Sequence, residues 1–178
     1  MIVLSHIVMV AVMTMTPVQM QNHGASLSSV GLVIGLHIAA MYLPSIGTGL
    51  LVDKIGRTTI AIASGITLAI ASLLAAFVPG DSIILLTIAL MLLGLGWNFG
   101  LISGTAIIVD STNLKTRAKT QGTVDVWVAL GGTAGSLLSG MVVGFASYLV
   151  LGILGALVSM IIPFIIFFQI KKLQSLPN

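Results

Sequence analysis

Long apolar stretches alternate with short polar ones along the whole chain. A helix needs about 20 residues to cross the hydrocarbon core of a bilayer, and each stretch is at least nearly that long. Leu, Ile, Ala, Gly and Met dominate these stretches, without the strict alternation of a barrel strand. Pro17, Pro44 and Pro163 can kink three of the helices. The pattern predicts six membrane-spanning helices, over residues 2–20, 29–51, 58–78, 83–109, 124–146 and 148–170.

The composition argues strongly against a water-soluble protein. Of the 178 residues, 57% are hydrophobic and 6% are charged, whereas soluble domains carry about 25% charged residues. The seven lysines and arginines are scattered and form no basic stripe, so we expect no binding to nucleic acid. Because the chain has no cysteine, it has no disulfide and no cysteine-ligated zinc. The histidines have no metal-like spacing either, and we expect no metal and no cofactor.

The basic residues predict how the chain is oriented. They lie between the second and third spans, between the fourth and fifth spans, and after the sixth span. Six antiparallel spans place these three segments on one side of the membrane, with Asp81 and the neutral stretch 21–24 on the other. The positive-inside rule then predicts a multi-pass protein of the cell (plasma) membrane with both termini in the cytoplasm.

A compact charged motif, G-x-x-x-D-K-x-G-R, follows the second span. It consists of Gly49, Asp53, Lys54, Gly56 and Arg57. In physical terms it predicts a tight turn, in which Gly49 allows close helix approach, Gly56 supplies permissive backbone angles, and Asp53 can cap the next helix. The two cations face the anionic inner leaflet. An ordinary positive-inside turn would contain the same charges, so that alternative stays open.

The motif resembles the signature loop of the major facilitator superfamily, whose members are twelve-helix secondary transporters. A second segment is similar to the family's loop after the fourth helix of a half, with Asp110, Arg117, Gln121 and Gly122. The resemblance covers the chain as one six-helix half and implies an all-α integral membrane fold of two three-helix repeats. It also implies that Asp53 is a conformational latch that docks on the opposite half, with Arg57 as its orienting partner.

The resemblance implies a function and partners as well. We expect transport of a small organic solute by alternating access, with proton-coupled efflux, in lipid and together with a second six-helix half. That half belongs either to the same longer chain or to a second copy. The fourth span lacks basic residues, and the segments around Pro17 and Trp97 look like the seventh and tenth helices of such transporters. The chain therefore most resembles a C-terminal half; the alternative is a non-transporting scaffold or truncated gene remnant.

Small residues recur at helical spacing in the fourth and fifth spans. Such stripes allow close helix packing in lipid, where apolar attraction between helices gives little net drive. We assign a packing role, and no substrate role, to Gly96, Gly100, Gly104, Gly132, Ser136 and Gly140.

Polar and adaptable side chains in the first and fourth spans are candidates for a substrate path. One arc of the first helix contains a methionine stripe, which can adapt to varied apolar ligands but is equally typical of core packing. An amide in the fourth span either lines a cavity or makes an interhelical hydrogen bond. The resemblance places these two helices against the central cavity. The candidates are His6, Met9, Met13, Thr16, Trp97 and Asn98.

The sequence predicts no enzyme. A rhomboid-type protease would need a histidine on the sixth span to accept the proton of Ser103, and that span contains none. An aspartyl protease would need two facing intramembrane aspartates, whereas all four aspartates lie at predicted helix ends.

Overall fold

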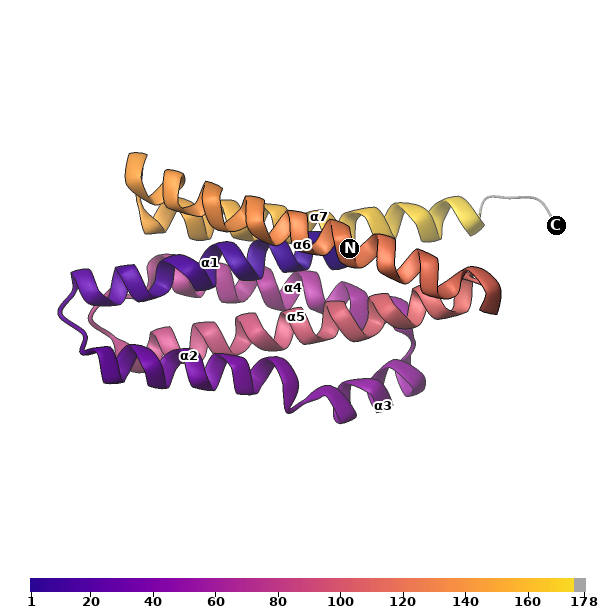
Figure 1. Cartoon of the computed structure of the whole chain (residues 1–178), viewed down its shortest axis with the longest axis horizontal. Coiled ribbons are helices and arrows are strands. Elements are labelled where there is room, and N and C mark those ends of the chain that lie inside the picture. Colours follow the sequence, from indigo (N-terminus) through magenta and orange to yellow (C-terminus); the bar gives the residue numbers. More distant parts are fainter. Residues whose placement is uncertain (175–178) are drawn as a thin grey trace.

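The computed structural model describes residues 1–174, and its regular structure there is entirely helical (Figure 1). Six segments are long and apolar enough to cross a membrane, which agrees with the expected all-α membrane fold. One of them, Leu27–Ile55, consists of two helices. The helices are α1 (Ile2–Asn22), α2 (Leu27–Tyr42), α3 (Ser45–Ile55), α4 (Arg57–Phe77), α5 (Ile83–Ser111), α6 (Leu114–Phe145) and α7 (Tyr148–Gln174).

The second span is broken in its middle, at Leu43 and Pro44 (Figure 1). Proline has no N–H to donate and its ring clashes with the preceding turn, so a regular helix cannot continue through it. The sequence predicted one span here, and the structure divides it into α2 and α3. Pro17 and Pro163, in contrast, lie inside continuous helices.

The packing follows a repeated pattern. α4 packs against α5 and α7, α1 packs against α6, and α2 packs against α5. Let the first three spans (α1, α2 with α3, and α4) be one repeat and the last three (α5, α6 and α7) another. The first helix of each repeat then contacts the second span of the other: α1 contacts α6, and α5 contacts α2. The third helices contact each other. This exchange is the arrangement of two inverted three-helix repeats.

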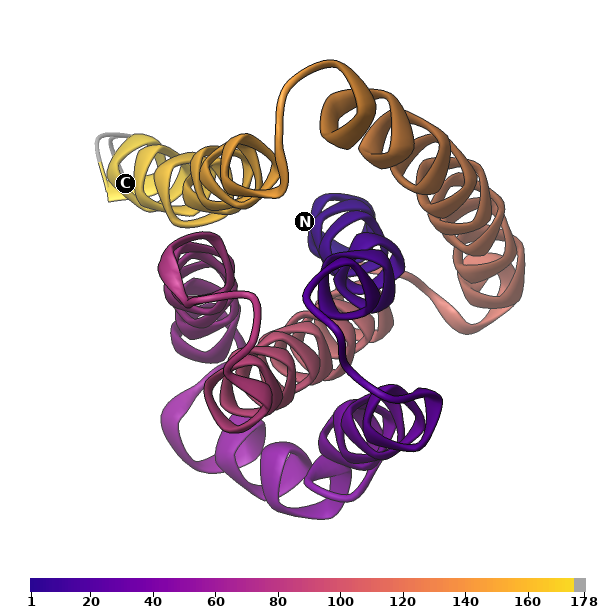
Figure 2. The ribbon, with the colours of Figure 1, turned by 90° about the vertical axis from the view of Figure 1, so that its left-hand side faces the viewer.

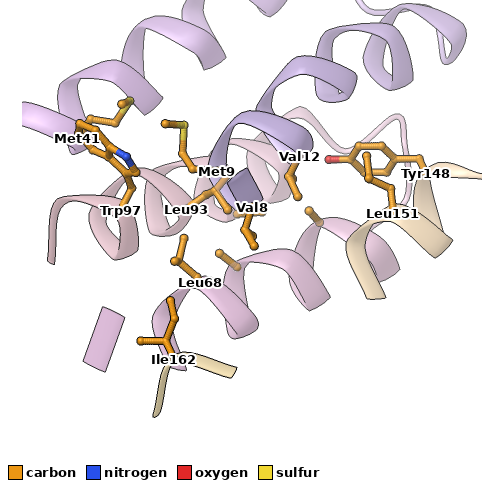
Figure 3. Packing of buried hydrophobic residues seen from close by; sticks show 13 residues of the cluster. Val8, Met9, Val12, Met41, Leu68, Leu93, Trp97, Tyr148, Leu151 and Ile162 are labelled. Atoms are coloured by element: carbon orange, nitrogen blue, oxygen red, sulfur yellow. The ribbon is translucent and has the colours of Figure 1, made fainter. Parts of the chain in front are cut away.

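Seen from its end, the bundle has α4 and α7 at one side, α1 and α5 in the middle, and α2 and α6 flanking them (Figure 2). The main core lies where α1, α4, α5 and α7 meet, and α2 adds Met41 (Figure 3). Its largest labelled members are Val8, Met9, Val12, Leu68, Leu93, Trp97, Tyr148, Leu151 and Ile162. The side of α1 that lies between α2 and α6 carries the half-buried His6, which packs on Gly132 of α6, and the half-buried Met13, which is two turns further along the same face. We call this side, together with the adjoining Tyr42 of α2, the inner face.

Glycines of α5 form a closely packed seam. A methyl group at Gly96 would lie 2.9 Å from Leu68 Cγ, and one at Gly100 would lie 2.8 Å from the hydroxyls of Ser5 and Ser64. Gly104 is similarly crowded by Ile2. The stripe therefore lets α5 approach both α1 and α4.

The glycines of α6 behave differently from the sequence expectation. Gly132 does contact α1, but a side chain at Gly140 would meet nothing within 4 Å, and Ser136 is only half-buried. The close contacts with Ile7 come from Gly131 and Gly135 instead. Of the predicted stripe, Gly132 therefore lies on the face of α6 that packs on α1, and Gly140 lies off that face.

Candidate functional site

The charged motif forms the sharp turn between α3 and α4. Gly56 has φ 95° and ψ 147°, a backbone conformation that residues with a side chain rarely adopt. Asp53 lies exposed in the last turns of α3. α4 begins at Arg57 with Gly56 as its N-cap residue and without a side-chain cap, so Asp53 does not cap it. A side chain at Gly49 would meet nothing within 4 Å, so Gly49 serves no close helix contact within this six-span body. Lys54 is exposed beside Asp53.

Arg57 joins this motif to the second charged segment. Its Nη1 donates to Asp110 Oδ2 at 2.6 Å, which connects the start of α4 with the end of α5. Both side chains are nearly half exposed, at 42% and 46%, so the pair adds at most about 1 kcal/mol to stability. In this structure Arg57 therefore pairs with Asp110 and not with Asp53, its expected partner.

The second segment is mostly helix, whereas the sequence predicted a loop up to residue 123. Asn113 caps α6 by accepting a hydrogen bond from the Thr116 N–H at 3.0 Å, so the helix begins at Leu114. Arg117 lies in its first turn and donates to the Val109 carbonyl at 3.0 Å, where its charge suits the C-terminal end of α5. Gln121 donates to Asp125 at 3.0 Å. Gly122 is exposed and has open space around it.

Asn98 binds both sides of the break in the second span. Its amide nitrogen donates to the Met41 carbonyl and to the Ser45 hydroxyl, each at 2.8 Å. Its amide oxygen accepts from the Thr48 hydroxyl at 2.6 Å. A continuous helix would pair the Met41 carbonyl with the N–H of residue 45, so the amide satisfies an acceptor beside the break. With 1% of Asn98 exposed, this geometry favours the interhelical hydrogen bond over cavity lining.

Trp97 lies between two side chains of the inner face. Its indole N–H donates to His6 Nδ1 at 3.1 Å. The Tyr42 ring packs against it nearly edge to face, with centroids 5.8 Å apart at an interplanar angle of 75°. Trp97 is 6% exposed and Tyr42 is 58% exposed, so Trp97 supports the tyrosine ring from behind.

The remaining path candidates lie mostly in the core. Met9 is buried among core residues, and Met13 is half-buried at the edge of the same cluster. Thr16 is buried and shares a 2.7 Å hydrogen bond with the Tyr148 hydroxyl. The structure thus brings His6 and Trp97 together, leaves Met13 nearby on the inner face, and places Met9 and Thr16 in helix packing.

Sequence reasoning missed the residues that act with these candidates. Ser45 and Thr48 follow Pro44 at helical spacing, so a polar face just after a mid-span proline was the available signal for the contacts of Asn98. Tyr42 and Tyr148 are single aromatic residues with no local pattern around them. Their contacts come from helices that are distant along the chain.

Comparison with known proteins shows which sequences this chain resembles. Two proteins of Bacillus subtilis (strain 168) are similar over most of the chain, and both are named uncharacterized MFS-type transporters. YdeG is 66% identical over 160 residues, covering 90% of this chain and 37% of its own length. YddS is 60% identical over 172 residues, covering 97% of this chain and 39% of its own length.

A third protein, the riboflavin transporter RfnT of Brucella anthropi, is 36% identical over 123 residues, covering 69% of this chain and 30% of its own length. The chain thus spans about two-fifths of the length of the two Bacillus relatives. The family model of the Major Facilitator Superfamily matches residues 1–177. The members of that family are transporters and not enzymes. The chain therefore belongs to the major facilitator superfamily and is a multi-pass membrane protein.

Proposed function

We propose that this chain is one half of a secondary transporter, most like a C-terminal half, which moves a small organic solute by alternating access. The family match over residues 1–177 carries this proposal. It is supported by the six-span bundle, in which Tyr42 and Trp97, near the middle of their spans, meet His6 of α1. Alternating access in such proteins is a rocking of one helix bundle against another around a central site.

The partner in this proposal is a second six-helix half, from the same longer chain or from a second copy. Support comes from the Bacillus relatives, of which the chain covers only 37% and 39%. α6 supports it as well, because its large side chains at Val126, Trp127 and Leu130 are exposed. In the membrane, part of this exposed apolar surface would contact lipid and part would contact the second half.

Asp53 is the proposed latch between the halves. Its side chain is exposed at the end of α3, and Arg57 is already engaged by Asp110. A free carboxylate at this position can bind the positive N-terminal end of a helix in the opposite half. The pair of Arg57 and Asp110 would then hold the α3–α4 turn against α5 while the latch opens and closes.

Replacing Asp53 by asparagine tests the proposed function. In the complete protein, Asp53→Asn is expected to reduce solute transport about fivefold or more, the lower end of typical coupling between two states. Its level in the membrane should stay unchanged. Uptake and efflux of a solute panel that includes riboflavin, the solute in the name of the Brucella relative, would be measured in vesicles.

The matched control is Asp81→Asn, which removes the carboxylate at the opposite ends of the helices. It should transport at the normal rate. Normal transport by Asp53→Asn would reject the latch. Absence of transport for every solute by the unaltered protein would instead favour a non-transporting scaffold.

Orientation and energy source are part of the same proposal. Both termini face the cytoplasm of the plasma membrane, because the described cations cluster at the ends of the helices next to the α3–α4 and α5–α6 turns (Figure 1). A proton gradient drives efflux. The mid-span His37 is a candidate for the proton path: it donates from Nδ1 to the Leu90 carbonyl at 2.6 Å, while its buried Nε2 has no partner among the described residues.

A further inference from the structure

The inner face carries an exposed aromatic ring at mid-membrane depth. Trp97 lies halfway along α5, and Tyr42 lies at the break in the middle of the second span. Because Tyr42 is 58% exposed, its ring and hydroxyl face outward from this half. A phenolic hydroxyl in the hydrocarbon core is costly without a hydrogen-bonding partner. Tyr42 is therefore better suited to a cavity between the halves than to lipid.

Trp97 fixes the protonation pattern of His6. An indole N–H can only donate, so His6 Nδ1 accepts the 3.1 Å hydrogen bond and carries no proton. In the neutral imidazole the proton is then on Nε2, which makes Nε2 a donor. A methyl group at Gly132 would lie 2.7 Å from Nε2, so the imidazole edge packs directly on the bare backbone of α6. The half-buried His6 makes no hydrogen bond from Nε2 within the described residues, so this donor is available to a ligand.

Within the part of the chain that the structure describes, no charged side chain lies at this depth. Among the described residues, the charged side chains lie toward the helix ends, and the one in α6 that comes nearest along the helix is Asp125. It is two turns from Gly132, about 10 Å along the axis. A charged ligand would therefore lack a counter-ion in this half, and an uncharged ligand suits the site better.

We propose that Tyr42 and His6 form a binding subsite for a neutral, planar aromatic heterocycle with a carbonyl or ring-nitrogen acceptor. The Tyr42 ring stacks on the ligand, and the Nε2–H of His6 donates to its acceptor. Trp97 is a positioning residue, because it supports the tyrosine ring and sets the histidine tautomer. This substrate class rests on the proposed transport function, since the complete site needs the second half.

The test is binding of acridone, a neutral planar heterocycle with a carbonyl, to the complete protein in nanodiscs. Its fluorescence anisotropy gives a dissociation constant for each variant. Tyr42→Leu is expected to weaken binding about tenfold, because the stacking ring is lost. His6→Phe keeps a planar aromatic ring but removes the donor, and should weaken binding about threefold to tenfold.

Phe164→Leu is the matched control, because Phe164 is 63% exposed and also belongs to an aromatic pair, but lies on α7. Its affinity for acridone should equal that of the unaltered protein. 2-Adamantanone, a carbonyl compound without a planar ring, should compete at least tenfold more weakly than unlabelled acridone.

Equal affinity in Tyr42→Leu and in the unaltered protein would overturn the inference, as would equal competition by 2-adamantanone. Failure of acridone to bind a protein that transports other solutes of the panel would also overturn it, while leaving the proposed function intact. Tyr42→Leu is expected to fold, since its side chain is largely exposed, and a thermal melt of each variant checks this.

Discussion

Replacing Asn98 by leucine is expected to destabilise the six-span body by about 2–4 kcal/mol. Leucine has the same branched heavy-atom skeleton but bulkier methyl groups, so the loss is mainly one of hydrogen bonds, with some overpacking added. Three bonds at about 0.6 kcal/mol each give nearly 2 kcal/mol, and leaving the buried Met41 carbonyl unpaired adds about 1–2 kcal/mol more. The effect is large because the side-chain amide of Asn98, on α5, forms hydrogen bonds with both α2 and α3.

A thermal melt of the purified protein measures this loss. Thr87→Val is the matched control on the same helix, because the Thr87 hydroxyl donates only to the Ile83 carbonyl of its own helix. It should melt within a degree or two of the unaltered protein. If Asn98→Leu melts normally but loses transport, Asn98 lines the substrate path, and the structural role assigned to it here is wrong.

Replacing Gly152 by leucine is expected to prevent α4 and α7 from packing. A methyl group at this position would already lie 2.6 Å from the Ser72 backbone carbonyl and 2.6 Å from Ala76 Cβ. A backbone cannot rotate aside as a flexible side chain can, so the helices must separate. We expect a loss of about 3 kcal/mol, at the upper end of the usual cost of overpacking.

The amount of folded protein in the membrane, measured by size-exclusion chromatography after extraction, should therefore fall severely for Gly152→Leu. Gly140→Leu provides the comparison, since a side chain there would meet nothing within 4 Å in this body. It should extract as a single folded species. Equal yields of the two variants would show that α4 and α7 do not meet at Gly152.

The sequence alone was sufficient for the number of apolar spans and for the close packing of α5. Bilayer thickness sets the length of a spanning helix, so the apolar stretches can be counted without knowledge of their neighbours. Gly96 and Gly100 recur every fourth residue and lie on one face, which is why their spacing predicted a contact. The break at Pro44 follows from the chemistry of proline, although Pro17 shows that the same residue can lie within an unbroken helix.

Contacts between distant segments could not be predicted in this way. Arg57 forms an ion pair with Asp110, which is 53 residues further along the chain, because α4 and α5 are antiparallel neighbours. Asp53 is closer in sequence but lies on another helix and is exposed. The spacing of the glycines in α6 likewise predicted a stripe of small residues, but it could not predict which face of α6 packs against α1. The contact with Ile7 therefore falls on Gly135 and not on Gly140.

The most direct test of the account labels single cysteines with a membrane-impermeant thiol reagent in intact cells. The chain has no cysteine of its own, so each introduced thiol is reported without background from this chain. A cysteine at Ser82 should react from outside, and one at Lys119 should react only after permeabilisation. In the complete protein, a cysteine at Met13 on the inner face should react, whereas one at Leu157 on the α4–α7 side should not. Labelling of Ser82 and Lys119 from the same side, or of Leu157 in place of Met13, would contradict a six-span half whose inner face lines the solute path.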